Sequence, residues 1–186
     1  MDSAHNMLHA FISCEPTILG AEIPMPTEHM NNLTAFLQNT LHIDFASITS
    51  FKAFARARIN SRVCHSTSYG RAIKQNSYTI LYTGDSSSTL LCGKVKYFVS
   101  LCATVSHKPK IVCAIEHFDT GLSLLSKTTN TALDHQLEKI FHSFAENTFN
   151  TVFITAEQIV SPCIRINMTE NKFVLATFPN KLDFIN

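Results

Sequence analysis

Residues 53–59, AFARARI, alternate small or apolar side chains with bulky or charged ones. Successive side chains of a β-strand point to opposite faces, so this period of two predicts a half-buried strand with Arg56 and Arg58 on a charged outer face. Residues 60–61 (NS) are typical of a turn, and residues 62–66 are expected to continue the strand pattern after it. This stretch therefore sets the fold class as mainly β.

Further runs rich in β-forming residues follow along the chain. They are separated by turn signals at intervals of about 15 to 20 residues, which favours an antiparallel meander or small barrel over alternating strands and helices. Within one of them, Lys94 and Lys96 alternate with Val95 and Tyr97, which predicts a charged face and an apolar face. The predicted strands are residues 77–82, 93–101, 111–118, 151–155, 163–168 and 172–178.

Two helices are predicted outside these strands. Apolar residues recur at helical spacing over residues 30–41 and again over residues 133–144, while three prolines make residues 1–26 irregular. The predicted organisation has an N-terminal helical and irregular segment at residues 1–50. Residues 51–186 then form a small, partly open antiparallel β-barrel that carries one late inserted helix.

Composition limits the function classes. With 45% hydrophobic and 16% charged residues, the 186-residue chain can bury a core, and a net charge of +1 gives no global attraction to nucleic acid or acidic membranes. There is no signal-peptide pattern and no apolar run of about 18 residues, so we expect an intracellular protein with no membrane partner. Six scattered cysteines are expected to be reduced core thiols.

No motif predicts catalysis or a bound metal. Cys113 and His117 would share one face of a strand but stand about 13 Å apart, too far for one ion. Gly93-Lys94 lacks the first glycine and the hydroxyl residue of a phosphate-binding loop. Nothing local marks a cysteine as a nucleophile. We therefore expect no catalytic residues, no metal, no cofactor and no small-molecule substrate.

Basic and aromatic residues gather on the first predicted strands. No Asp or Glu occurs between Phe45 and Gly84, so one face is expected to be positively charged. Basic side chains can contact phosphates and tyrosines can stack on bases, which predicts a DNA-binding face. The alternatives are an ordinary solvated strand surface with tyrosines that pack the barrel rim, or a fragment without function. A further alternative is a groove or aromatic cage, formed from among Tyr69, Tyr78, Tyr82 and Tyr97, for a protein or chromatin partner. The candidate contacts are Arg56, Arg58, Arg62, Arg71, Lys74, Lys94 and Lys96, with Tyr69, Tyr78 and Tyr97.

The central segment also resembles a known family. Residues 55–69 (ARARINSRVCHSTSY), 76–82 (NSYTILY) and 93–98 (GKVKYF) are similar to the C-terminal domain of proteins encoded by CACTA-type (En/Spm-like) DNA transposons. The closing stretch, from residues 152–154 (VFI) through 159–166 (IVSPCIRI) to 178–180 (FPN), is also similar to that family. Residues 119–148 depart from that pattern. The resemblance implies a small β-barrel comparable to the bromo-adjacent-homology modules of chromatin proteins. It also implies catalytic acids outside this chain and a nuclear, transposon-derived protein.

Overall fold

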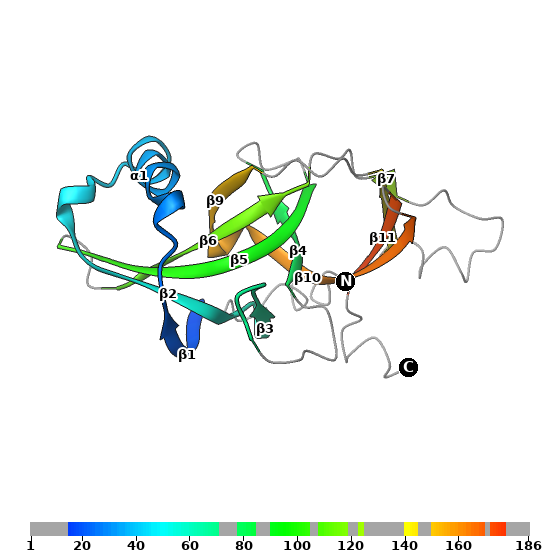
Figure 1. Cartoon of the computed structure of the whole chain (residues 1–186), viewed down its shortest axis with the longest axis horizontal. Coiled ribbons are helices and arrows are strands. Elements are labelled where there is room, and N and C mark those ends of the chain that lie inside the picture. The colour runs from blue at the N-terminus through cyan, green and yellow to red at the C-terminus, as the bar shows by residue number, and fades with distance from the viewer. Residues whose placement is uncertain are drawn as a thin grey trace, which may run out of the picture.

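A computed structural model describes residues 15–70, 78–84, 90–104, 108–118, 123–124, 140–144, 150–169 and 172–177. Within these ranges the chain forms an antiparallel sheet and one α-helix, which confirms the mainly β fold (Figure 1). The strands are β1 (Thr17–Ile23), β2 (Ile48–Ile59), β3 (Arg62–His65), β4 (Thr79–Thr83), β5 (Leu90–Ala103), β6 (Lys110–His117), β7 (Ser123–Leu124), β8 (Ile140–Phe144), β9 (Thr151–Thr155), β10 (Ile159–Thr169) and β11 (Lys172–Thr177). The helix is α1 (Met30–Asn39), and three short 3-10 turns are η1 (Thr27–His29), η2 (Phe45–Ser47) and η3 (Ala156–Gln158).

The 14-residue strand β5 is the spine of the sheet. One edge of β5 pairs with β6, and the other edge is shared by β4 along its first half and β2 along its second half. Beyond β4 the sheet continues through β10, β11, β8 and β7, while β1 and β3 flank β2 and β9 flanks β6. The sheet does not close on itself, so the predicted partly open barrel is confirmed.

A short segment after β3 fills the fork between β2 and β4. The amide of Ser66 donates to the carbonyl of Ala55 (3.0 Å), and the amide of Thr67 donates to the carbonyl of Val95 (2.8 Å). The amide of Val95 in turn donates to the carbonyl of Tyr78 (2.8 Å). The fork is therefore bridged by backbone hydrogen bonds, which satisfies donors and acceptors that the diverging strands would otherwise leave unpaired.

Two hydrophobic clusters form the core, and they take alternate residues, and so opposite faces, of β6 and β9. The first includes Ile59 and Val95, and the second packs Leu33 and Leu37 of α1 against Tyr97 and its neighbours. A β-bulge between Val95 and Tyr97 separates them, because an extra residue in one strand turns the following side chains to the other face. The predicted common face for Val95 and Tyr97 is therefore wrong.

The N-terminal part of the chain joins the barrel. The predicted helix is confirmed as α1, whose Leu33 and Leu37 are fully buried. Residues 17–23 were expected to be irregular, but they form β1 and pair with β2 across a bulge. Gly20 sits in this bulge with φ +88°, which explains how a strand interrupted by glycine still pairs.

The late helix predicted over residues 133–144 is wrong where the structure describes it. Residues 140–144 form β8, which pairs with β11. Pairing with an available strand overrides a helical spacing of apolar residues, since isoleucine and phenylalanine also favour strands. Residues 133–139 lie outside the described ranges.

Candidate nucleic-acid interface

The strands β1, β2 and β3 present an outer face that carries two arginines. Arg56 lies opposite Leu19 of β1 and His65 of β3, and Arg58 lies opposite Thr17 and Val63. Residues paired across strands share a face, while the alternate residues Ala57 and Ile59 are buried. We call Leu19, Arg56, Arg58, Val63 and His65, together with the adjacent Tyr69, the arginine face. Figure 1 shows β1 and β3 on the side of the sheet away from α1.

The guanidinium group of Arg56 lies over Tyr69 and close to Gly20. Its Cζ lies 4.9 Å from the centroid of the Tyr69 ring, in a cation–π arrangement worth about 0.5–1 kcal/mol at an exposed site. Its Nη2 lies 3.0 Å from the position that a Cβ on Gly20 would occupy. The bulge at Gly20 therefore gives the guanidinium room to lie close against β1.

His65 and Tyr69 form an aromatic pair beside Arg56. Their ring centroids are 4.8 Å apart with an interplanar angle of 43°. Partial burial, and then the nearby Arg56 charge, lower the pKa of His65 below its usual value. His65 is therefore neutral at pH 7, and it adds an aromatic ring to the arginine face rather than a third positive charge.

The acidic residues near β1 are already paired with lysines. Glu22 binds Lys52 (3.1 Å) and Glu15 binds Lys108 (2.6 Å), both at exposed sites. Within the described ranges, Arg56 and Arg58 make no ion pair. The arginine face thus carries two positive charges that no described carboxylate neutralises.

Arg62 does not belong to this face. It pairs with the buried Ile59 across a two-residue turn, so it shares the inner face of the β2–β3 hairpin. Its Nη1 donates to the hydroxyl of Ser161 on β10 (3.2 Å). The prediction of one exposed face for Arg56, Arg58 and Arg62 is therefore wrong for Arg62.

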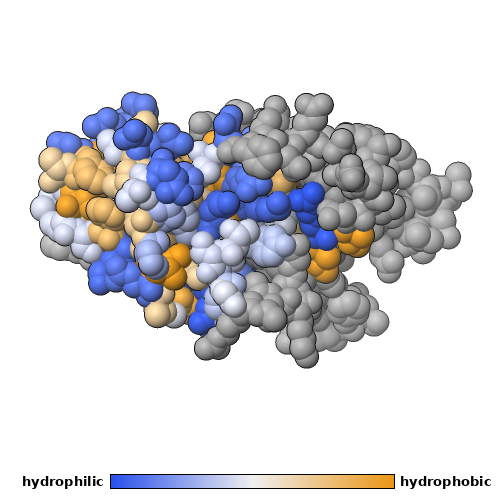
Figure 2. All heavy atoms as spheres, in the orientation of Figure 1, coloured by the Kyte–Doolittle hydropathy of each residue, from blue (hydrophilic) through white to orange (hydrophobic). Residues whose placement is uncertain are grey.

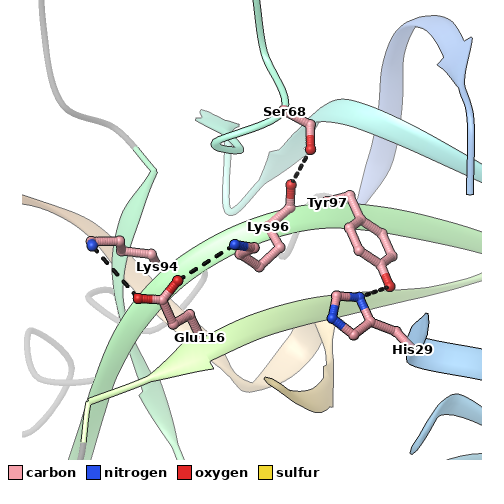
Figure 3. Close-up of polar contacts among 6 residues, drawn as sticks. All are labelled: His29, Ser68, Lys94, Lys96, Tyr97 and Glu116. Atoms are coloured by element: carbon pink, nitrogen blue, oxygen red, sulfur yellow. Dashed lines mark hydrogen bonds and ion pairs between the residues drawn. The ribbon is translucent and has the colours of Figure 1, made fainter. Parts of the chain in front are cut away.

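Lys94 and Lys96 share one carboxylate. The Nζ atoms of Lys94 and Lys96 lie 3.7 Å and 3.5 Å from the two carboxylate oxygens of Glu116 on β6 (Figure 3). Figure 3 also shows both lysines on the side of β5 from which Tyr97 reaches His29. Two lysines around one partly buried glutamate retain a net charge of +1. This group therefore attracts anions less strongly than the seven unpaired basic residues predicted from the sequence would.

The remaining predicted contacts are not brought to the arginine face. Arg71 and Lys74 lie outside the described residues. Tyr78 is half-buried, and its carbonyl bridges the fork in the sheet. Tyr97 is 1% exposed and its hydroxyl bonds Nδ1 of His29 (2.9 Å), so the prediction that it stacks on a base is wrong.

A groove or aromatic cage that uses Tyr82 or Tyr97 is also wrong, because both side chains are buried. Tyr82 is 2% exposed and belongs to the first hydrophobic cluster, whereas Tyr97 belongs to the second. Side chains on opposite faces of a sheet cannot enclose one ligand. Burial raises the pKa of both phenols, as expected for hydroxyl groups shielded from water.

The buried cysteines have the properties of core thiols. Burial raises the pKa of Cys64 and of Cys163 to about 12, and it raises the pKa of Cys113 well above its usual value. The thiolate is the nucleophile and metal ligand, so these side chains are unreactive at neutral pH. In the parts of the chain described above, no three His, Cys, Asp or Glu side chains are placed to hold one metal ion.

Sequence reasoning missed two features of these surfaces. Gly20 gave no signal by itself, because a glycine in an irregular segment predicts only a bend. Arg165 of β10 and Lys94 of β5 both lie over the Phe118 ring, at 4.9 Å and 5.4 Å from its centroid, and only long-range strand pairing brings them to this ring. The position of Arg62 could have been predicted from the sequence, because a two-residue turn at residues 60–61 pairs Arg62 with Ile59.

Comparison with known proteins adds no relative: no family model, no curated protein and no solved structure matches this chain. Among the described helices, none has the length and apolar character needed to cross a membrane.

Figure 2 shows hydrophilic residues gathered across the middle of one face of the molecule and hydrophobic surface toward the end that carries η2. Functional reasoning therefore starts from the geometry of the chain itself.

Proposed function

We propose that this chain is a non-catalytic binding module that contacts the phosphate backbone of nucleic acid through the arginine face. The observation that carries the proposal is the pair Arg56 and Arg58, which share a solvent-facing side of β2 and have no ion-pair partner among the described residues. Arg56 is held against Gly20 and Tyr69, so little side-chain freedom is lost when it binds an anion.

The number of available cations sets the expected strength of binding. Each phosphate neutralised on duplex DNA contributes a slope of about −0.9 to the plot of log affinity against log salt. Two or three contacts predict a slope of about −2 to −3, whereas the seven predicted from the sequence would give about −6. Dissociation constants of about 10⁻⁴ to 10⁻⁶ M are typical of such non-specific backbone binding.

The test is a salt titration of binding to a random-sequence DNA duplex, followed by fluorescence anisotropy. Arg58→Ala should reduce both the affinity and the salt slope, by about one unit of slope if one phosphate contact is lost. Lys110→Ala is the matched control, because it removes one exposed positive charge at the end of β6 that pairs with Leu101. No binding at low salt, or equal effects of the two substitutions, would contradict the proposal.

The same proposal places the chain in a transposon-derived nuclear protein. The support is the resemblance of residues 55–69 and 93–98 to CACTA-type transposon proteins, together with a barrel-like fold of the kind that the resemblance implies. In that setting the module would hold DNA or chromatin for a catalytic domain elsewhere. Nuclear accumulation of the tagged chain in cells, reduced by Arg56→Ala with Arg58→Ala, is the expected observation.

A second candidate function is a protein-interaction module. Val160 and Ile166 on β10 are 48% and 51% exposed, and Val63 on the arginine face is 38% exposed. Exposed apolar side chains favour a protein partner when they lie together, and apolar contacts depend little on salt. A chain that binds no nucleic acid at low salt would shift the weight to this candidate.

A further inference from the structure

We propose that the arginine face binds single-stranded nucleic acid in preference to duplex, with the backbone at Arg56 and Arg58 and a base on the Tyr69–His65 ring pair. This inference rests on the function proposed above and names its ligand class. It combines two features that the arginine face places side by side: fixed positive charge and partly exposed aromatic rings.

The first argument is the composition of the face. Phosphates are common to single and double strands, but ring faces are useful only for bases that are not already stacked inside a duplex. Tyr69 and His65 are both half-buried, with ring centroids 4.8 Å apart. Because the lowered pKa leaves His65 neutral at pH 7, the ring pair adds an aromatic surface beside the arginines rather than a third positive charge. An aromatic pair beside two arginines matches the way in which single strands are bound without base-specific contacts.

The second argument is that the hairpin cannot enter a duplex groove as a free ribbon. A two-stranded β-ribbon fits the major groove only if it projects from the protein. Here the tip of the β2–β3 hairpin is attached to β10: the Asn60 side-chain amide donates to the carbonyl of Ile159 (3.0 Å), and Arg62 donates to Ser161 (3.2 Å). The hairpin therefore offers its outer face, which suits an extended strand lying across it.

The third argument is preorganisation. Arg56 lies over Tyr69 and against the Gly20 bulge, so its planar guanidinium group has a defined position before any ligand arrives. Arg58 is two residues along the same strand and points to the same face, about 6.6 Å away. A planar guanidinium group binds phosphate oxygens in a fork geometry and also stacks on bases. The two arginines can thus follow a backbone while the rings meet a base.

DNA and RNA single strands share this chemistry, so the experiment includes both. The full chain is titrated with fluorescent oligothymidylate, oligouridylate and a duplex, each about ten nucleotides long. We expect both single strands to bind about tenfold or more tightly than the duplex. A preference for one of the two single strands would identify the sugar that is recognised, since the 2′-hydroxyl is the group that differs.

Substitutions separate the ring contact from the charge. Tyr69→Ala should weaken single-strand binding about tenfold and duplex binding less, because the duplex loses only the ordering of Arg56 by the ring. Tyr69→Phe should restore both, because the ring is retained. Arg58→Ala should weaken binding to all three ligands. Thermal unfolding of each variant shows whether the fold is kept, and the comparison of single strands with duplex on the native chain remains decisive if Tyr69→Ala does not fold.

The outcomes distinguish the two proposals. If no ligand binds at low salt, nucleic-acid binding itself is refuted. If the duplex binds as tightly as the single strands and Tyr69→Phe, Tyr69→Ala and the native chain bind alike, the single-strand inference is overturned while backbone binding through Arg56 and Arg58 stands.

Discussion

Replacing Gly93 by alanine is expected to destabilise the protein. Gly93 lies at the centre of three strands, paired with Ile80 of β4 and with His117 of β6. A Cβ at this position would lie 2.4 Å from Cγ2 of Ile115 and 2.7 Å from the carbonyl oxygen of Glu116. Both neighbours are on β6, and Ile115 is fully buried.

The size of the effect follows from these two contacts. Ordinary van der Waals contact begins at 3.4 Å, so the Ile115 side chain would need to move by about 1 Å inside a closely packed cluster. The Glu116 carbonyl is backbone, so it can move only if β5 and β6 separate locally. Overpacking costs about 1–3 kcal/mol and a disrupted hydrogen bond about 1 kcal/mol more, giving a loss of about 2–4 kcal/mol in the free energy of unfolding.

The assay is urea unfolding followed by circular dichroism, with Gly70→Ala as the matched control. No atom lies within 4 Å of a Cβ on Gly70, so that variant should keep its stability or gain a few tenths of a kcal/mol through reduced freedom of the unfolded chain. Adding Ile115→Ala to Gly93→Ala removes one of the two contacts, so the double variant should lose less than the sum of the singles. A Gly93→Ala midpoint equal to that of the native chain would refute the reasoning.

Two further predictions concern buried polar groups. Tyr97→Phe removes the hydrogen bond to His29 and should lower the free energy of unfolding by about 1 kcal/mol, measured by urea unfolding; an unchanged midpoint would show that this bond does not help to hold α1 on the sheet. Burial raises the pKa of Cys64 and of Cys163 from 9.0 to about 12 in the folded chain, so between these values only the unfolded state loses the proton. Stability is therefore complete below pH 9 and falls as pH rises toward 12, by about 1.4 kcal/mol per pH unit for each thiol. Cys64→Ala should flatten this fall in alkaline denaturation curves, and an identical slope in the variant would contradict it.

The β2–β3 hairpin shows how far sequence reasoning reaches. Alternation over residues 53–59 predicts the strand, its buried alanines and the outward Arg56 and Arg58, because one buried face imposes a period of two. The turn at residues 60–61 is also confirmed, with both residues at positive φ (49° and 62°). These features are local, so the sequence contains the information that determines them.

Features that depend on distant strands were not predictable. The bulge that turns Val95 and Tyr97 to different faces is defined by the register of β6, and no residue type within β5 predicts it. The bulge at Gly20 likewise appears only once β1 is paired with β2. Residues 140–144 joined β11 despite a helical spacing, since pairing energy from a neighbouring strand outweighs a weak local preference.

The shared edge of β5 has a consequence for how the chain folds. The β4–β5 and β5–β6 pairs join strands that are consecutive in sequence. In contrast, β3 and β4 lie between β2 and β5 in the sequence, and β4 pairs with β10 through residues as distant in sequence as Thr79 and Cys163. Pairings between distant segments are slow to form because the chain loses loop entropy before any contact compensates for it. A β4–β5–β6 meander would then assemble first and leave a strand edge open until β2 and β10 arrive. Chains released at high concentration during that interval would be prone to associate through that edge, so dilute refolding should give the higher yield.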